Sequence, residues 1–331
     1  MKNMHFSSSW FLFLFSIATL VLHVVTANDT TTNNVKSTTA NSPQHGQFTL
    51  SRSIVTARAF QSESQHSPYH EPLAKLFMIE SLMDTVKEMH GNIERNQVVE
   101  PVARHMIIEK MMHDTMIHSN KGLNGPKQVI IFGAGFDTRA NRFANILPVQ
   151  KWFEIDLPEP QQFKVETLEK HQISDPDNLI RISANLTDPM DSWYDKLVDA
   201  GWDSSAPTIF ILEGLIYYLT TEEVHNLLSS IPDVPNSKII LTIIDKSLYK
   251  LSLKYGGNRF NWKTNLKELN KAGVLKFRNY RLKRSIGTSN PKQIGLNVRV
   301  KKMFSPSVSV WDRIKYFFHY PLEMVMEFEA V

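Results

Sequence analysis

The chain has no cysteine among its 331 residues. A disulfide framework, a thiolate nucleophile and zinc or iron–sulfur centres held by cysteine are therefore excluded. Histidines at a metal-binding spacing such as H-E-x-x-H are also absent, so we expect no metal site. Hydrophobic residues make up 42% and charged residues 21%, which is the composition of a globular protein with one large domain or two modest ones.

Long hydrophobic runs are scarce. The longest covers residues 10–25 and is preceded by the basic residue Lys2. Small residues at Val25 and Ala27 follow the usual pattern of a secretory signal peptide, so residues 1–27 are predicted to be cleaved off after Ala27. The run is shorter than the roughly 20 residues of a comfortable membrane span. We therefore expect a protein of the secretory pathway or a secreted one; the alternative is a membrane anchor formed by residues 10–25.

Apolar residues are almost lacking in residues 28–47, which cannot bury a core and are predicted to be a disordered linker. Residues 48–126 are predicted to form an N-terminal helical cap. Apolar residues recur there three and four positions apart, within 73–89 and 101–117.

Acidic residues are scarce between Lys246 and Lys302, where 16 lysines and arginines face a single acid, Glu268. This segment carries a net charge of +15, whereas the formal net charge of the whole chain is +4. We expect a solvated basic face, and the alternative is attraction to an anionic surface or partner. No nucleic-acid partner is expected, because no recognition motif accompanies the charge.

From residue 127 onward, short apolar runs alternate with helical patterns. Strands are predicted at 128–133, 151–156, 179–184, 207–214 and 238–245. Helices are predicted from about 137, from 158, around 189–199 and from Thr220, and helical sequence follows the fifth strand up to about Ala272. Thr220 and Glu223 match a capping box. Residues 274–284 and 294–304 are predicted to close the sheet as an antiparallel pair. The pattern predicts an α/β fold with a mostly parallel sheet and helices on both faces.

The first predicted strand runs into Gly133-Ala134-Gly135, a turn that lets backbone approach a ligand closely. A complete G-x-G-x-x-G pattern would need a third glycine, and Thr138 stands there instead. A turn around another nucleotide-like cofactor is therefore favoured over one that grips a pyrophosphate.

The ends of the later strands carry polar residues. Asp156 ends the second strand, 21 residues after Gly135, where an acid can bind both ribose hydroxyls; its alternative role is a helix N-cap. At the end of the third strand, Asn185 and Leu186 are expected near an adenine. Glu213 follows the buried fourth strand and is expected to meet a cationic group of the cofactor, the alternative being a surface acid.

Three further side chains follow Glu213. Tyr217, Tyr218 and His225 could border the pocket of an acceptor molecule. The alternative is that they are packing or helix-surface residues, and for His225 this alternative is preferred.

Three motifs resemble those of the leucine carboxyl methyltransferase family. They are GAGFDTR from Gly133 to Arg139, an Asp-x-Pro segment from Asp156 to Lys164, and EGLIYYL from Glu213 to Leu219. In this order and spacing they resemble the bacterial-type O-methyltransferase branch more than the protein phosphatase 2A methylating enzymes. Arg104 and the segment from Thr56 to Phe60 resemble further family elements.

The resemblance implies a class I methyltransferase fold, which is Rossmann-like, and a bound S-adenosyl-L-methionine, so residues 127–331 would be the cofactor-binding domain. It implies that Arg104 pairs with the methionyl carboxylate, that Gly133, Ala134 and Gly135 line the methionine and ribose, that Asp156 takes the ribose hydroxyls, and that Glu213 lies near the methionyl amine. The family's third strand ends in Asp-Leu, and Asn185-Leu186 stands here instead. An amide oxygen can still accept from the adenine amino group.

We therefore predict a methyltransferase that methylates a carboxylate or hydroxyl oxygen of a small molecule or of a protein, with Tyr218 at the acceptor pocket. One alternative is a nicotinamide-dependent oxidoreductase on a similar fold, which Thr138 and the Glu213-Gly214 pair disfavour. The other is a non-catalytic secretory protein that retains the fold.

Overall fold

The computed structural model describes residues 43–119, 125–246, 249–250, 254, 260–262, 279–301 and 323–331. The predicted signal peptide, most of the linker, most of the helical sequence expected before Ala272 and part of the basic segment lie outside these residues, and those assignments stay predictions. None of the helices within the described part of the chain is long and apolar enough to span a bilayer.

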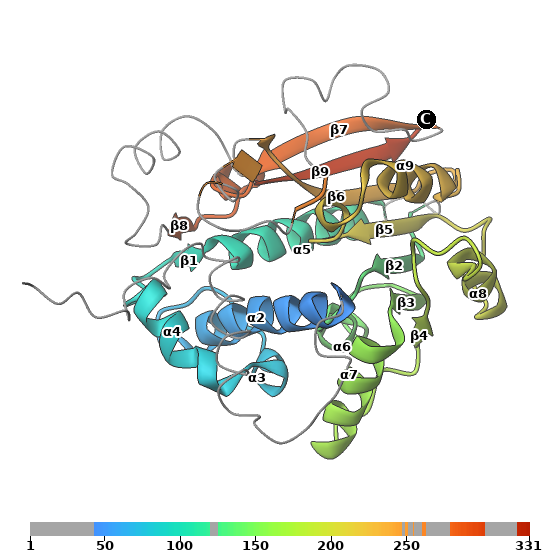
Figure 1. Cartoon of the computed structure of the whole chain (residues 1–331). Helices are drawn as coiled ribbons and strands as arrows, with labels where there is room; N and C mark the ends of the chain where they lie inside the picture. Colours follow the sequence, from blue (N-terminus) through green and yellow to red (C-terminus); the bar gives the residue numbers. More distant parts are fainter. Residues whose placement is uncertain are drawn as a thin grey trace, which may run out of the picture.

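A seven-stranded sheet forms the centre of the molecule, in the order β4-β3-β2-β5-β6-β9-β7 (Figure 1). Its strands are β2 (Gln128–Phe132), β3 (Lys151–Asp156), β4 (Leu179–Ser183), β5 (Thr208–Leu212), β6 (Lys238–Ile244), β7 (Tyr280–Gly287) and β9 (Glu323–Ala330). Strands β2 to β6 are parallel, and β9 runs antiparallel to both of its neighbours. The predicted α/β sheet with antiparallel closing strands is thus confirmed.

The central strands are mainly apolar because helices cover both faces of the sheet. Every residue of β2 is buried, and successive side chains enter opposite layers: Val129 and Ile131 on one side, Ile130 and Phe132 on the other. The first layer holds α5 (Glu100–Ser119) and α6 (Arg139–Phe143); the second holds α8 (Trp193–Asp199) and α9 (Thr221–Ser230). Helix α7 (Pro158–Lys170) joins the N-terminal helices through Leu168.

The N-terminal helices differ from the prediction in three ways. Helix α2 (Pro43–Glu63) begins five residues before the expected boundary at 48. The predicted helix at 73–89 is two helices, α3 (Ala74–Phe77) and α4 (Glu80–His90). Helix α5 was assigned to the cap but packs on the sheet, because Ile107, Met111 and their neighbours meet the buried face of β2 and β5.

The break between α3 and α4 has a tertiary cause. Two side chains of α2 bind the backbone at this point: Arg52 Nη2 donates to Met78 O at 3.0 Å, and Ile79 N donates to Thr56 Oγ1 at 3.0 Å. Backbone groups that are paired in this way are not available to a continuous helix.

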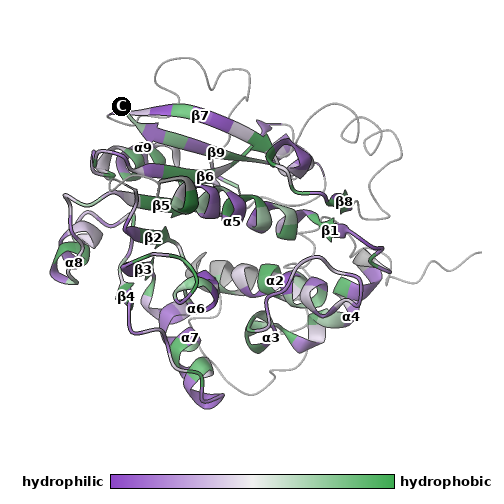
Figure 2. Cartoon of the chain, turned by 180° about the vertical axis from the view of Figure 1, so that it is seen from behind, coloured by the Kyte–Doolittle hydropathy of each residue, from purple (hydrophilic) through white to green (hydrophobic). Residues whose placement is uncertain are grey.

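The antiparallel pairing at the C-terminal end also differs from the prediction. Strand β7 pairs with β9, which was not predicted, and β8 (Arg299–Lys301) instead pairs in parallel with β1 (Gln97–Val99) in a separate two-stranded sheet. Strand β9 brings Val325, Met326 and Phe328 into the core beside β6, whereas no residue of β8 is fully buried. Both hydrophilic and hydrophobic residues occur along β7 and β9, in contrast to the buried central strands (Figure 2).

The helix starts are partly as predicted. Helix α9 begins with the predicted capping box, in which Glu223 N donates to Thr220 Oγ1 and Thr220 N donates to Glu223 Oε2. Helix α7 begins at Pro158 as expected. Helices α6 and α8 begin later than expected, at Arg139 and Trp193.

Candidate functional site

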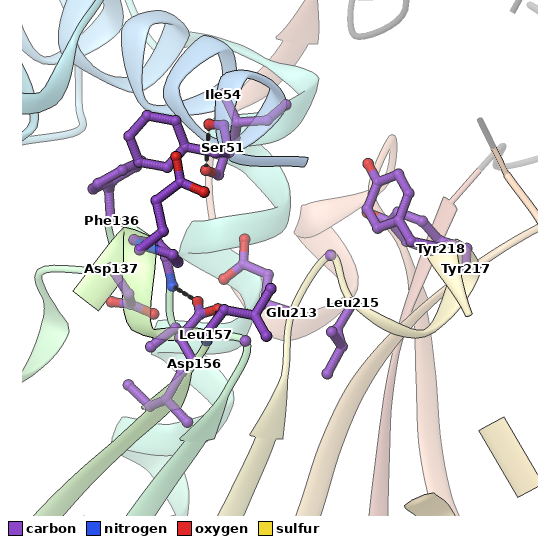
Figure 3. A pocket seen from close by; sticks show the side chains of 18 of the residues that line it. Ser51, Ile54, Phe136, Asp137, Asp156, Leu157, Glu213, Leu215, Tyr217 and Tyr218 are labelled. Carbon is purple, nitrogen blue, oxygen red and sulfur yellow. Dashed lines mark hydrogen bonds between the residues drawn. The ribbon is translucent and has the colours of Figure 1, made fainter. Parts of the chain in front are cut away.

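The carboxyl ends of β2, β3 and β5 open onto a pocket of about 170 Å³. Figure 3 shows Asp156 and Glu213 rising from the strands on either side of β2, with Ser51 and Ile54 of α2 across from them. The lining residues are Phe48, Ser51, Ile54, Arg58, Arg104, Ile131, Gly133, Ala134, Gly135, Phe136, Asp137, Asp156, Leu157, Glu159, Pro160, Glu213, Gly214, Leu215, Tyr217, Tyr218 and Leu219. The pocket therefore unites most of the predicted site residues.

The turn after β2 requires glycine at two positions. Gly133 and Gly135 have φ angles of +60° and +46°, a region that residues with a Cβ rarely adopt. A Cβ on Gly133 would also lie 2.9 Å from Leu215 Cδ1. The turn thus brings bare backbone to the edge of the pocket.

Asp156 fixes this turn to the end of β3. Its Oδ2 accepts from Gly135 N at 2.5 Å, and its Oδ1 accepts from Leu157 N at 2.7 Å. Burial raises the pKa of Asp156, against the effect of these two backbone donors. The N-cap of α7 is Leu157 and no side chain caps that helix, so the alternative role of Asp156 as a helix cap is not what the structure shows.

Two buried cations hold the outer part of the same turn. Arg58 of α2 donates to Phe136 O at 2.6 Å while its guanidinium is paired with Glu71 at 2.9 Å. Lys164 of α7 donates to Asp137 O and, at 2.7 Å, to Glu154. Three elements, α2, β3 and α7, therefore preorganise the glycine turn.

Glu213 lies between two buried arginines. Its Oε1 accepts from Arg104 Nε at 2.9 Å, its Oε2 accepts from Arg139 Nη2 at 2.5 Å, and His105 Nδ1 is 3.1 Å from Oε2. Burial acts to raise the pKa of Glu213, but Arg139, His105 and Arg104 outweigh it and hold that pKa well below the ordinary value. Glu213 is thus a buried anion anchoring two guanidinium groups, and the alternative of a surface acid is wrong.

These groups belong to a larger set, which we call the buried ion network. It consists of Arg58, Arg104, Arg139, Arg142, Glu71, Glu109, Asp137, Glu213 and Glu323. Ions removed from water in this way persist only when they are paired and hydrogen-bonded. The network lies under one side of the pocket and gives it fixed charges.

The network makes stability sensitive to acid. Burial raises the pKa values of Glu71, Glu109, Asp137 and Glu213, but neighbouring cations outweigh it and leave all four below their ordinary values. A carboxyl group whose pKa is lowered by folding stabilises the protein above its unfolded pKa, near 4, and loses this contribution as the pH falls.

We therefore expect the free energy of unfolding to fall by about 2–5 kcal/mol between pH 6 and pH 3. Asp156 and Glu323, whose pKa values burial raises, act in the opposite sense and reduce the net effect. Urea denaturation at a series of pH values measures it. The Glu109→Gln variant should be less stable at pH 6 and should lose less on acidification. A midpoint that stays constant down to pH 3 would contradict the expectation.

Three predicted residues are not in the pocket. Asn185 and Leu186 follow β4 but do not line the pocket. Asn185 Oδ1 accepts from Thr187 N at 3.1 Å and from Thr187 Oγ1 at 3.0 Å, and Leu186 packs against the core. His225 is partly buried on α9, away from the pocket.

The two tyrosines after Glu213 have different surroundings. Tyr218 lines the pocket, as predicted, and packs against Tyr217 and Phe260. Tyr217 is buried, and its hydroxyl accepts from Arg104 Nη1 at 3.0 Å. Both tyrosines line the pocket, but the Tyr217 hydroxyl is engaged by Arg104 and Glu323.

Sequence reasoning missed the contribution of α2. Ser51, Ile54 and Arg58 are spaced by three and four residues, so they share one helix face, and that face covers the pocket. This spacing was a usable signal. Glu323 was also missed, and its sequence neighbourhood gave no signal because its partners lie far away in the chain.

The model of the leucine carboxyl methyltransferase family matches residues 52–232. This span is more than half of the chain, so the protein belongs to that family. The fold expected from the three motifs, a class I methyltransferase fold with a mostly parallel seven-stranded sheet, agrees with the observed topology.

Individual relatives are similar over shorter stretches. The Bacillus subtilis protein "Putative S-adenosyl-L-methionine-dependent methyltransferase YktD" is 33% identical over 153 residues, which are 45% of this chain and 47% of that protein. "Putative S-adenosyl-L-methionine-dependent methyltransferase SCO7813" of Streptomyces coelicolor is 29% identical over 54% of this chain and 62% of that protein. The chain thus matches about half to three-fifths of the length of these relatives.

A crystal structure of a putative methyltransferase from Thermobifida fusca YX is similar to this fold. Its TM-score is 0.49 at 13% sequence identity, and the match covers 84% of this chain and 94% of that one.

Proposed function

We propose that this protein is an S-adenosyl-L-methionine-dependent methyltransferase that methylates an oxygen atom, either a carboxylate or a hydroxyl, of its acceptor. The observation that carries the proposal is the convergence of the glycine turn, Asp156 and Arg104 on one pocket. The family of the chain and the names of its relatives support the same cofactor.

The donors and acceptors around the pocket fit this cofactor. A carboxylate has about four acceptor positions, and backbone donors use two of those on Asp156, which leaves two for the ribose hydroxyls. Gly133 and Gly135 leave room for the ligand against the backbone. Arg104 Nη2 lies beside Gly214 at the pocket, 3.3 Å from where a Cβ would stand, and is placed to bind a carboxylate.

The cofactor, when bound, supplies a methyl group on a sulfonium centre. The task of the protein is then alignment, since an in-line displacement needs the acceptor oxygen about 3 Å from the methyl carbon. Ile54, Leu215, Tyr218 and Leu219 line the pocket with mainly apolar surface. A carboxylate acceptor needs no base at neutral pH, and a hydroxyl acceptor would gain from one.

The nicotinamide alternative has less support. Thr138, at the place of the third glycine, is fully buried and donates to Glu71 Oε1 at 2.6 Å. A packed side chain there is at odds with the close helix–strand approach that the third glycine serves in dinucleotide-binding turns.

Calorimetric titration of the purified chain tests the proposal. We expect saturable binding of S-adenosylmethionine and S-adenosylhomocysteine and none of NAD. Absence of binding at millimolar S-adenosylmethionine, by a protein with a folded circular dichroism spectrum, would overturn the assignment. Binding without turnover of any carboxylate or hydroxyl acceptor would favour the non-catalytic alternative.

A further inference from the structure

We infer that Glu323, at the start of β9, is a positioning residue for the cofactor: it holds Arg104 so that Nη2 faces the cofactor carboxylate. This inference rests on the proposed function. Glu323 lies far beyond position 232, where the segment matched by the family model ends. The C-terminal strand would thus complete a site whose other parts come from residues 48–219.

The direction of β9 explains how so distant a residue reaches the site. Strands β2 to β6 are parallel, so their carboxyl ends share the edge where the pocket opens. Because β9 is antiparallel to β6, its first residue stands at the carboxyl end of β6, where Glu323 pairs with Ile244. A parallel strand in this place would have put its first residue at the opposite edge.

Glu323 is buried and bound to Arg104 directly. Its Oε1 accepts from Arg104 Nη1 at 3.0 Å and from the Tyr217 hydroxyl at 3.2 Å, while Arg104 Nη1 also donates to that hydroxyl at 3.0 Å. The backbone is fixed as well, since Thr288 N donates to Glu323 O at 3.0 Å. The carboxylate, the phenol and the guanidinium therefore form a closed triangle below the pocket.

Arg104 has more N–H donors than this triangle uses. A guanidinium has five N–H donors in a rigid plane. Nε donates to Glu213, and Nη1 donates to Tyr217 and Glu323. Within the described part of the chain Nη2 has no acceptor, and it lies beside Gly214 at the pocket.

Glu213 alone would not fix this orientation. It also accepts from Arg139, and its single contact with Arg104 is at Nε. Glu323 adds a second charged contact at another nitrogen of the guanidinium group, Nη1. With both carboxylates in place, the guanidinium group of Arg104 cannot rotate and Nη2 is directed at the ligand. Less conformational entropy of Arg104 is then lost when the ligand binds.

The test compares two ligands that differ in the carboxylate alone. Binding of S-adenosylmethionine and of decarboxylated S-adenosylmethionine is measured by calorimetry for the wild type and for Glu323→Gln. We expect the variant to bind S-adenosylmethionine roughly tenfold more weakly, the order expected when a charge-assisted hydrogen bond is misaligned. Its affinity for the decarboxylated analogue should stay within about twofold of the wild type, since that ligand has no group for Nη2.

Glu327→Gln is the matched control, because Glu327 is a buried acid of the same strand that binds Arg284 and does not line the pocket. It should change neither affinity. In an Arg104→Gln background, Glu323→Gln should cause no further loss. If Glu323→Gln does not fold, Glu323→Asp, which keeps the charge but shortens its reach, should show the same selective loss.

Equal weakening of both ligands would overturn the inference, because Glu323 would then support the pocket as a whole. Unchanged affinity for both ligands would overturn it too. A wild type that binds neither ligand would instead refute the proposed function, and the inference with it, before any variant is compared.

Discussion

Replacing Glu213 with alanine should lower the free energy of unfolding by about 3–5 kcal/mol, the cost of removing one partner from a buried ion pair. The carboxylate accepts from Arg104 and Arg139, both buried, and lies beside His105. Its removal leaves two buried guanidinium groups short of an anion. A loss of this size is a large part of the stability of a typical domain.

Urea denaturation at pH 7 measures the effect. Glu213→Gln keeps the shape and one acceptor oxygen, so it should be less harmful than Glu213→Ala. Glu222→Ala, at an exposed site on α9, is the control and should change stability by no more than about 0.5 kcal/mol. A loss below about 1 kcal/mol for Glu213→Ala would mean that the arginines find other partners.

Replacing Asp156 with alanine should weaken binding of S-adenosylhomocysteine by about 1–3 kcal/mol, or roughly 5- to 150-fold. Two effects act together. The ribose hydroxyls lose their acceptor, and Gly135 N loses the partner that holds the glycine turn in its bound shape. The turn is also held by Arg58 and Lys164, so the protein should stay folded.

Calorimetric titration and a thermal melt of the same samples measure affinity and stability separately. A helix-capping role would lower the melting temperature and leave the affinity unchanged. Asp156→Asn, which keeps one carbonyl acceptor, should fall between the wild type and Asp156→Ala. Asp199→Ala, an exposed acid at the end of α8, should alter neither quantity.

The sequence determined the central strands and the glycine turn. The apolar runs of β2, β3, β5 and β6 specify strands buried on both faces, and their order along the chain makes them parallel. Parallel strands have their carboxyl ends at one edge, so Gly133, Asp156 and Glu213 could be expected there; they share the pocket because β3 and β5 lie on either side of β2, whereas Asn185, after β4, does not line it. Local patterns suffice here because each residue is placed by its own strand.

Tertiary structure alone decided the rest. Two contacts from α2 break the helix at Met78, and the need for an apolar neighbour to β6 selects β9 rather than the predicted segment at 294–304. Arg104 and Glu323 are 219 positions apart, and only the antiparallel entry of β9 brings them together. Such pairings depend on which distant surfaces bury each other, and neither periodicity nor motif spacing encodes that.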